Sequence, residues 1–535
     1  MNFKTKFKEN FGKLIIVACF ACFALLLHFV YLMRNKQNDS FRIMCIVIGI
    51  ILFCLVFVEF YLSYFREWPI HRLYFVAALV IGIVFMFVIP PYATPDERTH
   101  TSSSIHVSNV IMGYGEPDDG TNNLYMRNTE HNAQINEYVK WNDYKIFLDD
   151  ISLTTTEDER EMVAINIPYP GPAILYLIPG IGITIGRLLH FGGTATILLA
   201  TLCNILFFVI STTFAIKIIP FEKDVLMVIS MFPMVLQLTS SLSYDNAVLS
   251  SFFVVIAIGL KWSYAKQLPV TRKEIIVYLV YGAITCLVKG GVYAMFLLLP
   301  VICNSSKTTI KNIWSKYKYW IIAGVILFLA VLGRNAIFSI VRSLFVTNSV
   351  DISQTVQENY SIWDNNYIQW AECEGYSLKQ FLLNPPLLIV ILLNTLVSNL
   401  SYYTSGMIAS PLGWLNIEIP WFYIVSYVVV LFIASIKVEN APVYLKKRDR
   451  ILVILFGLIS IGLSSAALLM YWTPTTYSYI AGIQGRYFIP PFIMMILMTR
   501  NDLITTKKKM TRGILMSMLI LTMISVFYIL RAATV

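Results

Sequence analysis

The sequence predicts an all-α, polytopic membrane protein, and its composition and the spacing of its apolar runs carry this prediction. Hydrophobic residues make up 57% of the 535 residues and charged residues only 13%, against roughly 25% charged in soluble domains. Mean hydropathy is +0.67. Apolar runs long enough to cross about 30 Å of hydrocarbon recur from Leu14 to Leu530. The net charge of +10 is then typical of basic cytoplasmic loops and not of nucleic-acid binding.

About thirteen apolar runs are expected to be transmembrane helices, because each combines sufficient length with few charges. In chain order they lie at about 14–33, 43–64, 73–90, 193–218, 225–241, 246–264, 274–288, 291–304, 319–338, 421–437, 451–471, 487–499 and 513–530.

Two further apolar pieces, at about 170–188 and 385–405, each begin with a cluster of prolines. They are expected to be helices partly embedded in the outer leaflet. If the first piece crossed the bilayer, the basic loops between 261 and 318 would face outward, against the positive-inside rule. The resulting topology puts the N-terminus in the cytoplasm and two large loops, 91–167 and 340–420, on the outer face.

The expected organisation has three parts. Residues 1–72 form an N-terminal two-helix module, residues 73–499 form the transmembrane core with both outer loops, and residues 500–535 form a C-terminal transmembrane helix.

Two neighbouring carboxylates, Asp96 and Glu97, follow the third span in the stretch from Pro90 to His100. The prolines at the start of this stretch cannot continue a helix, so they fix an extended exit at the membrane surface. A reaction at a membrane face needs its acid or base there. The alternative is that the carboxylates only pair with Arg98 in a solvated loop.

Other polar residues come to the same depth in this topology. Asp245 and Asn246 lie in an outer turn, where Asp245 is alternatively a helix N-cap. Lys289 lies between two short apolar runs, where the alternative is snorkelling to the interface. Arg486 follows Gly482-Ile483-Gln484-Gly485 at a helix start, and a guanidinium beside backbone amides is a common way to hold phosphate.

This combination suits chemistry on a lipid-linked phosphate. A carboxylate, Asp96 or alternatively Glu97, would accept the proton of an attacking hydroxyl, while Arg486 and Lys289 would stabilise charge on the departing phosphate. His100 is expected to be interfacial or to support the site. A divalent cation bound by Asp96, Glu97 and Asp245 stays an open alternative, and no other cofactor is implied.

Several short motifs resemble, in order, the bacterial domain-of-unknown-function 2142 membrane family. They are Pro95-Asp96-Glu97 with His100, residues 241–246, Lys289-Gly290, Asn384-Pro385-Pro386 with residues 392–396, residues 411–415, and Gln484-Gly485-Arg486-Tyr487-Phe488. The resemblance runs from about 73 to 499. It implies a branch of the GT-C glycosyltransferases, with Asp96 or Glu97 as base and with Arg486, Lys289, Gln484 and Tyr487 at the lipid-phosphate donor.

The sequence therefore predicts an inverting GT-C-like glycosyltransferase of the bacterial cytoplasmic membrane, with its active site on the outer face. It would move a sugar from a polyprenyl-phosphate donor to a cell-envelope glycan, glycolipid or protein. Asp245, Asn246 and Trp414 are candidates for supporting or acceptor contacts, and Trp363, Trp370, Tyr402 and Tyr403 are further candidates for stacking on sugar rings. The rivals are a glycolipid transporter or flippase and a non-catalytic component of polysaccharide assembly.

Overall fold

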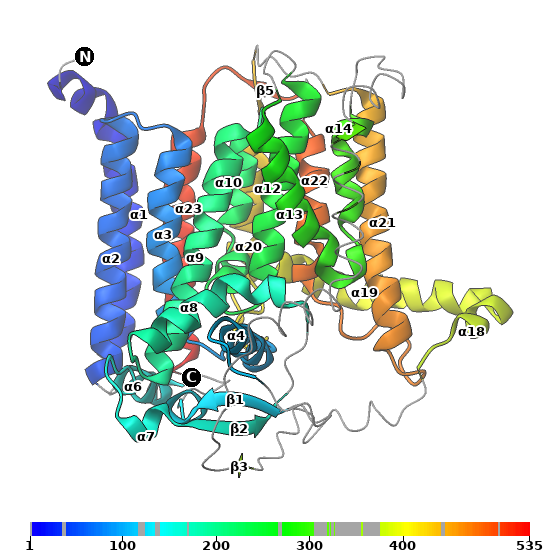
Figure 1. Ribbon diagram of the computed structural model, residues 1–535. Coiled ribbons are helices and arrows are strands. Elements are labelled where there is room, and N and C mark those ends of the chain that lie inside the picture. The colour runs from blue at the N-terminus through cyan, green and yellow to red at the C-terminus, as the bar shows by residue number, and fades with distance from the viewer. Residues whose placement is uncertain are drawn as a thin grey trace.

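A bundle of upright helices with a small layer of short helices and strands at one end makes up the protein (Figure 1). The structure is a computed structural model, and it describes residues 3–34, 39–115, 123–133, 140–167, 171–265, 270–303, 318–319, 322, 326, 355–356, 375–439, 445–500 and 503–534. We call the end with the short elements the polar end. The opposite end, which carries the N-terminus, is the basic end.

Eight helices of the described chain are long and apolar enough to cross a bilayer. Seven of them confirm predicted spans: α1 (Phe3–Arg34), α2 (Asp39–Tyr64), α3 (Ile70–Val88), α9 (Gly193–Ile218), α12 (Asp245–Tyr264), α21 (Lys447–Tyr471) and α23 (Thr511–Ala532). The protein is thus a polytopic α-helical membrane protein.

The shorter predicted spans are less regular. The span expected at 225–241 is two helices, α10 (Lys223–Ser230) and α11 (Pro233–Thr239), because Pro233 has no amide hydrogen and starts a new helix at its first position. The remaining predicted spans correspond to α13 (Arg272–Leu287), the sequence η2 (Val288–Gly291), η3 (Ala294–Leu298) and α14 (Leu299–Ile302), α20 (Trp421–Ala434), and η4 (Gly485–Phe488) with α22 (Ile489–Met498). Most of the span expected at 319–338 lies outside the described residues.

The two proline-led pieces do not stand upright in the bundle. Helix α8 (Leu177–Leu188) directly follows η1 (Ala173–Tyr176), and together they form one of the shorter apolar helices, below the length of the eight candidate spans. Helix α19 (Pro385–Ile408) is long enough, but with α18 (Leu378–Leu383) it lies across the upright helices near the polar end (Figure 1).

Contacts before and after α19 agree with this orientation. Before its start, the hydroxyl of Tyr376 donates to the carbonyl oxygen of Tyr477, just beyond the end of α21, at 2.7 Å. Just after its end, Trp414 Nε1 donates to the carbonyl oxygen of Tyr92, just beyond the end of α3, at 2.9 Å. Both α3 and α21 finish at the polar end (Figure 1), so α19 starts and ends on one side.

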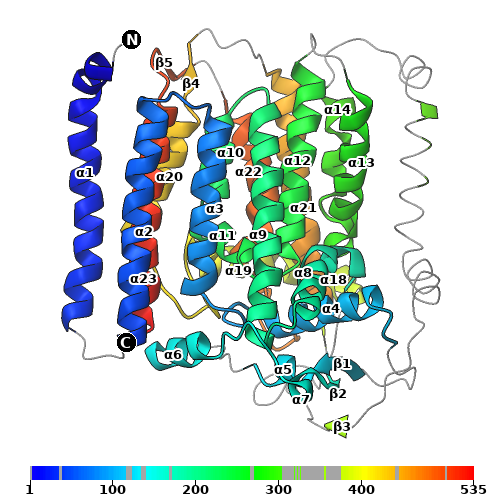
Figure 2. The same cartoon turned by 60° about the vertical axis from the view of Figure 1, so that its left-hand side comes forward.

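The layer at the polar end contains α4 (Glu97–Ile111), β1 (Asn123–Arg127), α5 (Asn128–His131), α6 (Trp141–Asp149), α7 (Glu157–Arg160), β2 (Met162–Asn166) and β3 (Thr355–Val356). Strand β2 pairs antiparallel with β1 and parallel with β3. Two further strands, β4 (Lys437–Val438) and β5 (Thr505–Thr506), pair at the basic end (Figure 2).

A fully buried ion pair joins this layer to α8. Arg187 Nε and Nη2 each donate to one carboxylate oxygen of Glu130 at 2.6 Å, and Arg187 Nη1 donates to Asn109 Oδ1 at 2.7 Å. Both charged side chains are essentially inaccessible to solvent. Loss of one partner of such a pair typically costs about 3–5 kcal/mol, because the other charge is left buried and unpaired. This pair therefore fixes α4, α5 and α8 relative to one another.

The first two helices and the last helix pack together at one edge of the bundle (Figure 2). His28 of α1 lies 3.4 Å from the carbonyl oxygen of Met523 in α23. The hydroxyl groups of Tyr31 and Thr534 are 2.6 Å apart. The two ends of the chain thus form one packed unit beside the core.

Cysteine labelling tests the orientation of α19. In a variant whose native cysteines are replaced by serine, Lys379→Cys and Glu418→Cys flank this helix. We expect both to react with a membrane-impermeant thiol reagent under the same condition as Asn132→Cys at the polar end, and Lys273→Cys at the basic end only under the opposite condition. Reaction of positions 379 and 418 from opposite sides would mean that α19 crosses the membrane.

Candidate functional site

The loop after α3 presents Asp96 in an unusual backbone conformation. Asp96 has φ 63° and ψ 10°, the left-handed region, and is the N-cap residue of α4 without a side-chain capping bond. This conformation is costly for a residue with a Cβ, by roughly 1–3 kcal/mol, and such residues are concentrated at functional sites. The side chain is 59% exposed. Its carboxylate is therefore free of capping and open to solvent.

The neighbouring carboxylate, that of Glu97, is buried and accepts several hydrogen bonds. Glu97 is 1% exposed and accepts hydrogen bonds from Tyr92 N (2.9 Å), Thr94 Oγ1 (2.7 Å) and Leu242 N (3.0 Å). Burial raises the pKa of Glu97 to about 7, although these donors oppose the shift. The side chain joins the loop of residues 90–97 to the turn before α12. This geometry places Glu97 in the scaffold of the site, so Asp96 is the better candidate of the two for a base.

Arg486 is the buried centre of the site. Its side chain is 7% exposed and lies between two carboxylates, with Nη2 3.7 Å from Asp96 Oδ2 and Nε 3.6 Å from Asp245 Oδ2. Both distances exceed ordinary hydrogen-bond lengths. Nε has no hydrogen-bond partner among the described residues, and the guanidinium lies 5.5 Å from the ring centroid of Tyr487. Arg486 is thus loosely paired and retains donor capacity.

A contact between two glycines sets the position of Arg486. A Cβ on Gly485 would overlap the carbonyl oxygen of Tyr403 and would lie 2.6 Å from backbone atoms of Gly406 and Met407. Only glycine allows η4 to approach the end of α19 this closely. Arg486 is therefore held directly beside the last turn of α19.

Asp245 occupies the first turn of α12 and is 10% exposed. Tyr244 is the N-cap residue, so the N-cap interpretation of Asp245 is wrong. Asn246 forms hydrogen bonds to α9 and within α12. Its Nδ2 donates to the carbonyl oxygen of Asn204 in α9 at 2.8 Å, and its Oδ1 accepts from Ser250 Oγ in α12 at 3.0 Å. Asp245 therefore faces the site, whereas Asn246 joins α12 to α9.

His100 and Trp414 support the surroundings of the site. His100 Nδ1 lies 2.9 Å from the hydroxyl oxygen of Tyr176, and its ring meets Tyr244 edge-on at 5.1 Å. Trp414 donates from Nε1 to the carbonyl oxygen of Tyr92 and so holds the proline-rich loop. The structure thus gives both residues contacts that position other residues of the site.

Of the other residues predicted to contact the sugar donor or a sugar ring, the structure describes only some. Gln484 and Arg486 line a cavity of about 10 Å³, with Tyr402 on the same wall. Gln484 Oε1 is buried without a hydrogen-bond partner in the described part of the chain. Lys289 lies in η2, but its side chain is outside the described residues, as are Trp363 and Trp370. A cavity of this size holds about one water molecule, so the space beside Gln484 and Arg486 is closed in this conformation.

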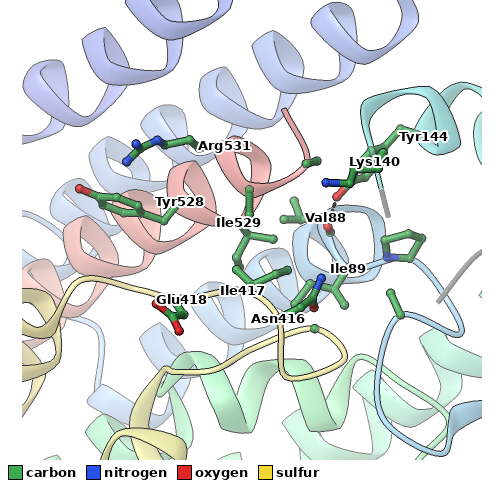
Figure 3. A pocket seen from close by; sticks show the side chains of 15 residues that line it. Val88, Ile89, Lys140, Tyr144, Asn416, Ile417, Glu418, Tyr528, Ile529 and Arg531 are labelled. Atoms are coloured by element: carbon green, nitrogen blue, oxygen red, sulfur yellow. Dashed lines mark hydrogen bonds between the residues drawn. The ribbon is translucent and has the colours of Figure 1, made fainter. Parts of the chain in front are cut away.

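A larger cavity, of about 640 Å³, lies beside the same loop (Figure 3). Its wall includes Pro90 and Ala93, three residues before Asp96. Lys140 and Arg531 lie on opposite sides of it, and Tyr528, Asn416 and Glu418 add aromatic and polar groups. None of the predicted site residues lines this cavity.

The described residues do not support the alternative of a divalent cation bound by Asp96, Glu97 and Asp245. The oxygens of Glu97 already accept bonds from the scaffold. Among the described residues, no group of three His, Cys, Asp or Glu side chains could hold a metal ion.

Sequence reasoning missed the polar contacts that assemble the site. Of these contacts, the pair of Arg187 and Glu130 is the one that the sequence could have indicated, because an arginine within an apolar run needs a buried partner. Gln237 was missed as well: it accepts from Gly413 N at 2.8 Å and donates to Gly413 O at 3.1 Å. Tyr293 donates to the carbonyl oxygen of Tyr487 at 2.8 Å. No local sequence signal announces the last two contacts.

Comparison with known proteins gives one match. The model of a family described as predicted membrane protein (DUF2142) matches residues 79–497. No curated protein matches, and no solved structure matches.

The contact between η4 and α19 can be tested with a glycine substitution. Gly485→Ala adds a methyl group against backbone atoms that cannot move independently, and overpacking of this kind typically costs about 1–3 kcal/mol. We expect a clear fall in melting temperature in detergent. Gly462→Ala in α21 is the matched control, because nothing lies within 4 Å of the added Cβ, and it should be neutral or slightly stabilising. Equal melting temperatures for both variants would contradict the close approach.

Proposed function

The chain belongs to the family of predicted membrane proteins described as DUF2142, and we propose that it is a GT-C-like, inverting glycosyltransferase. Its donor would be a polyprenyl-phosphate sugar, and its acceptor a cell-envelope glycan, glycolipid or protein. One observation supports this proposal most: the open carboxylate of Asp96 lies 3.7 Å from the nearly buried guanidinium of Arg486. A base beside an anion-binding group is the pair that transfer from a lipid phosphate requires.

In the proposed reaction, an acceptor hydroxyl attacks the anomeric carbon of the donor sugar. Asp96 takes the hydroxyl proton as the new carbon–oxygen bond forms. The bond between the anomeric carbon and the phosphate oxygen breaks, and the polyprenyl phosphate leaves with the electron pair. Arg486 would stabilise this leaving phosphate, because its Nε lacks a hydrogen-bond partner among the described residues. Asp245 would hold the guanidinium in place from the other side.

Helix α19 supports a lipid-linked donor. It is apolar, lies across the bundle and exposes large side chains such as Leu393 and Val397, which is 84% exposed. Its last turn touches Gly485, the residue before Arg486. A polyprenyl chain lying against α19 would therefore bring its phosphate to Arg486.

The distribution of charge supports an outward-facing site. Arg272, Lys273 and Lys447 are exposed at the ends of helices away from the polar layer. By the positive-inside rule, the basic end would face the cytoplasm. The N-terminus would then be cytoplasmic, and Asp96 would lie at the outer face of a bacterial plasma membrane.

The cavity of Figure 3 suits the acceptor. Asn416, Glu418 and Lys140 offer hydrogen-bonding groups of the kind that sugar hydroxyls require, and Tyr528 offers an aromatic face. Because Ala93 lines this cavity, an acceptor bound there would approach Asp96 along the proline-rich loop.

Asp96→Asn separates catalysis from folding. The variant keeps the shape of the side chain but removes the base, so sugar transfer should fall by about 10²–10⁴-fold with an unchanged melting temperature. Mass spectrometry of cell-envelope glycans from cells that carry either form would report the loss.

Glu97→Gln is the contrasting variant, because it puts an amide NH₂ against backbone donors. It should lower the melting temperature. Since burial raises the pKa of Glu97 to about 7, the stabilising effect of this carboxyl is largest at low pH and declines as pH rises through 7. The difference in stability between wild type and Glu97→Gln should therefore shrink between pH 5 and pH 8.

The outcome that would contradict catalysis concerns Asp96→Asn. Normal cell-envelope glycans in cells with this variant would favour a glycolipid transporter or a non-catalytic assembly component.

Arg486→Lys tests recognition of the donor phosphate. Lysine keeps the positive charge but loses the planar fork that can give two parallel hydrogen bonds to a phosphate. With a panel of polyprenyl-phosphate-linked sugars, the apparent KM for donor should rise about 10-fold or more, whereas that for acceptor should change little. Arg486→Ala should be worse. An unchanged donor KM in the alanine variant would mean that Arg486 only pairs with Asp96 and Asp245.

A further inference from the structure

A second large cavity, of about 1360 Å³, lies at the basic end, away from Asp96. It is formed by residues of α1, α2, α3, α10, α20 and α23 together with β4 and the chain that leads into α23. Figure 2 shows β4 and β5 at this end of the bundle, beside the N-terminus. Seven basic and three acidic residues line the cavity.

The acidic residues in its wall are largely engaged. Arg500 Nη1 pairs with Glu222 Oε1 at 3.2 Å, and both side chains are buried. Asp224 accepts from Thr511 Oγ1 at 2.7 Å. The seven basic and three acidic residues leave the wall with a net formal charge of +4.

The basic residues keep free donor capacity. Lys508 and Lys509 are exposed, and within the described residues neither forms an ion pair. Arg500 is 7% exposed, and its Nε has no hydrogen-bond partner in the described part of the chain. Arg512 and Lys13 both lie over the Tyr64 ring, at 5.6 and 5.0 Å from its centroid. An anion in this cavity would thus meet Lys508 and Lys509, which have no ion pair among the described residues, and the Nε of Arg500, whose Nη1 pairs with Glu222.

Below the basic mouth the wall becomes apolar. The cavity reaches Ser517, six residues into α23, which is a depth of about 9 Å along the helix. Leu73, Val430 and Ile433 add apolar side chains to the wall, and Trp68 precedes α3 at the basic end. Tryptophan and tyrosine at this level are typical of the membrane–water interface. The cavity is therefore built for a ligand with an anionic head and an apolar continuation.

We propose that this cavity binds the phosphate-bearing headgroup of an anionic membrane lipid, with the first carbons of its chains against the apolar wall. A soluble phosphate compound would use the basic mouth but not the 9 Å of apolar wall beneath it. Basic pockets between transmembrane helices on the basic side of a membrane protein are a known type of site for such headgroups. The site is separate from the proposed transferase chemistry and does not depend on it.

The full-length protein in a neutral detergent provides the test. Binding of phosphatidylglycerol, phosphatidylcholine and glycerol 3-phosphate is measured by titration and by native mass spectrometry. The test variant is Lys508→Gln/Lys509→Gln/Arg512→Gln. The matched control, Arg272→Gln/Lys273→Gln/Lys447→Gln, removes three exposed charges that do not line the cavity. Melting temperatures of both variants confirm that they are folded.

Wild type and the control should bind phosphatidylglycerol at least 10-fold more tightly than phosphatidylcholine. The test variant should lose about 100-fold in affinity, since each basic residue facing an anionic lipid contributes roughly fivefold. Glycerol 3-phosphate should not displace the lipid. Equal loss in both variants, or no loss in the test variant, would overturn the site. Displacement by glycerol 3-phosphate at lipid-like concentrations would show that the anion is soluble and that the lipid assignment is wrong.

Discussion

The carboxylate of Glu97 is the interaction on which the geometry of the site depends. It accepts from two backbone amides and one hydroxyl that belong to segments 145 residues apart in sequence. Without it, the proline-rich loop and the turn before α12 would each leave a buried donor unsatisfied, at about 1–3 kcal/mol apiece. Because the loop carries Asp96 and the turn carries Asp245, this one side chain fixes the two carboxylates that flank Arg486.

The two adjacent acids have different environments. Asp96 has the strained backbone and the exposed side chain, whereas Glu97 has the buried and fully bonded one. The buried pair of Arg187 and Glu130 extends the same scaffold into the polar layer. Rigid polar contacts of this kind cost desolvation energy. Because they hold the surrounding segments in place, Arg486 needs no close hydrogen bonds of its own to the two carboxylates, and its N–H donors stay available in a closed environment.

Much of the fold follows from the sequence, since apolar length and charge distribution directly reflect the cost of crossing a bilayer. The long helices and the horizontal α19 were predictable for this reason, and proline chemistry indicated where α19 begins. The breaks in the short spans were not, because 3-10 segments such as η2 and η3 arise from packing. At the site, Asp96, Asp245 and Arg486 were predicted to lie near one another, and they do. The difference between the exposed Asp96 and the buried Glu97 was not predictable. It depends on the backbone amide of Leu242, which only the folded chain brings close to Glu97.

The packing of α1 and α2 against α23 has a consequence for biogenesis. Helix α23 is synthesised roughly 500 residues after α1, and at about 5–20 residues per second this takes about half a minute to two minutes. During that interval the first two helices must reside in the membrane without their final partner. The basic cavity, whose wall includes α1, α2, α3 and α23, is completed only when α23 inserts. This edge of the bundle and the cavity in it can therefore close only after α23 has inserted.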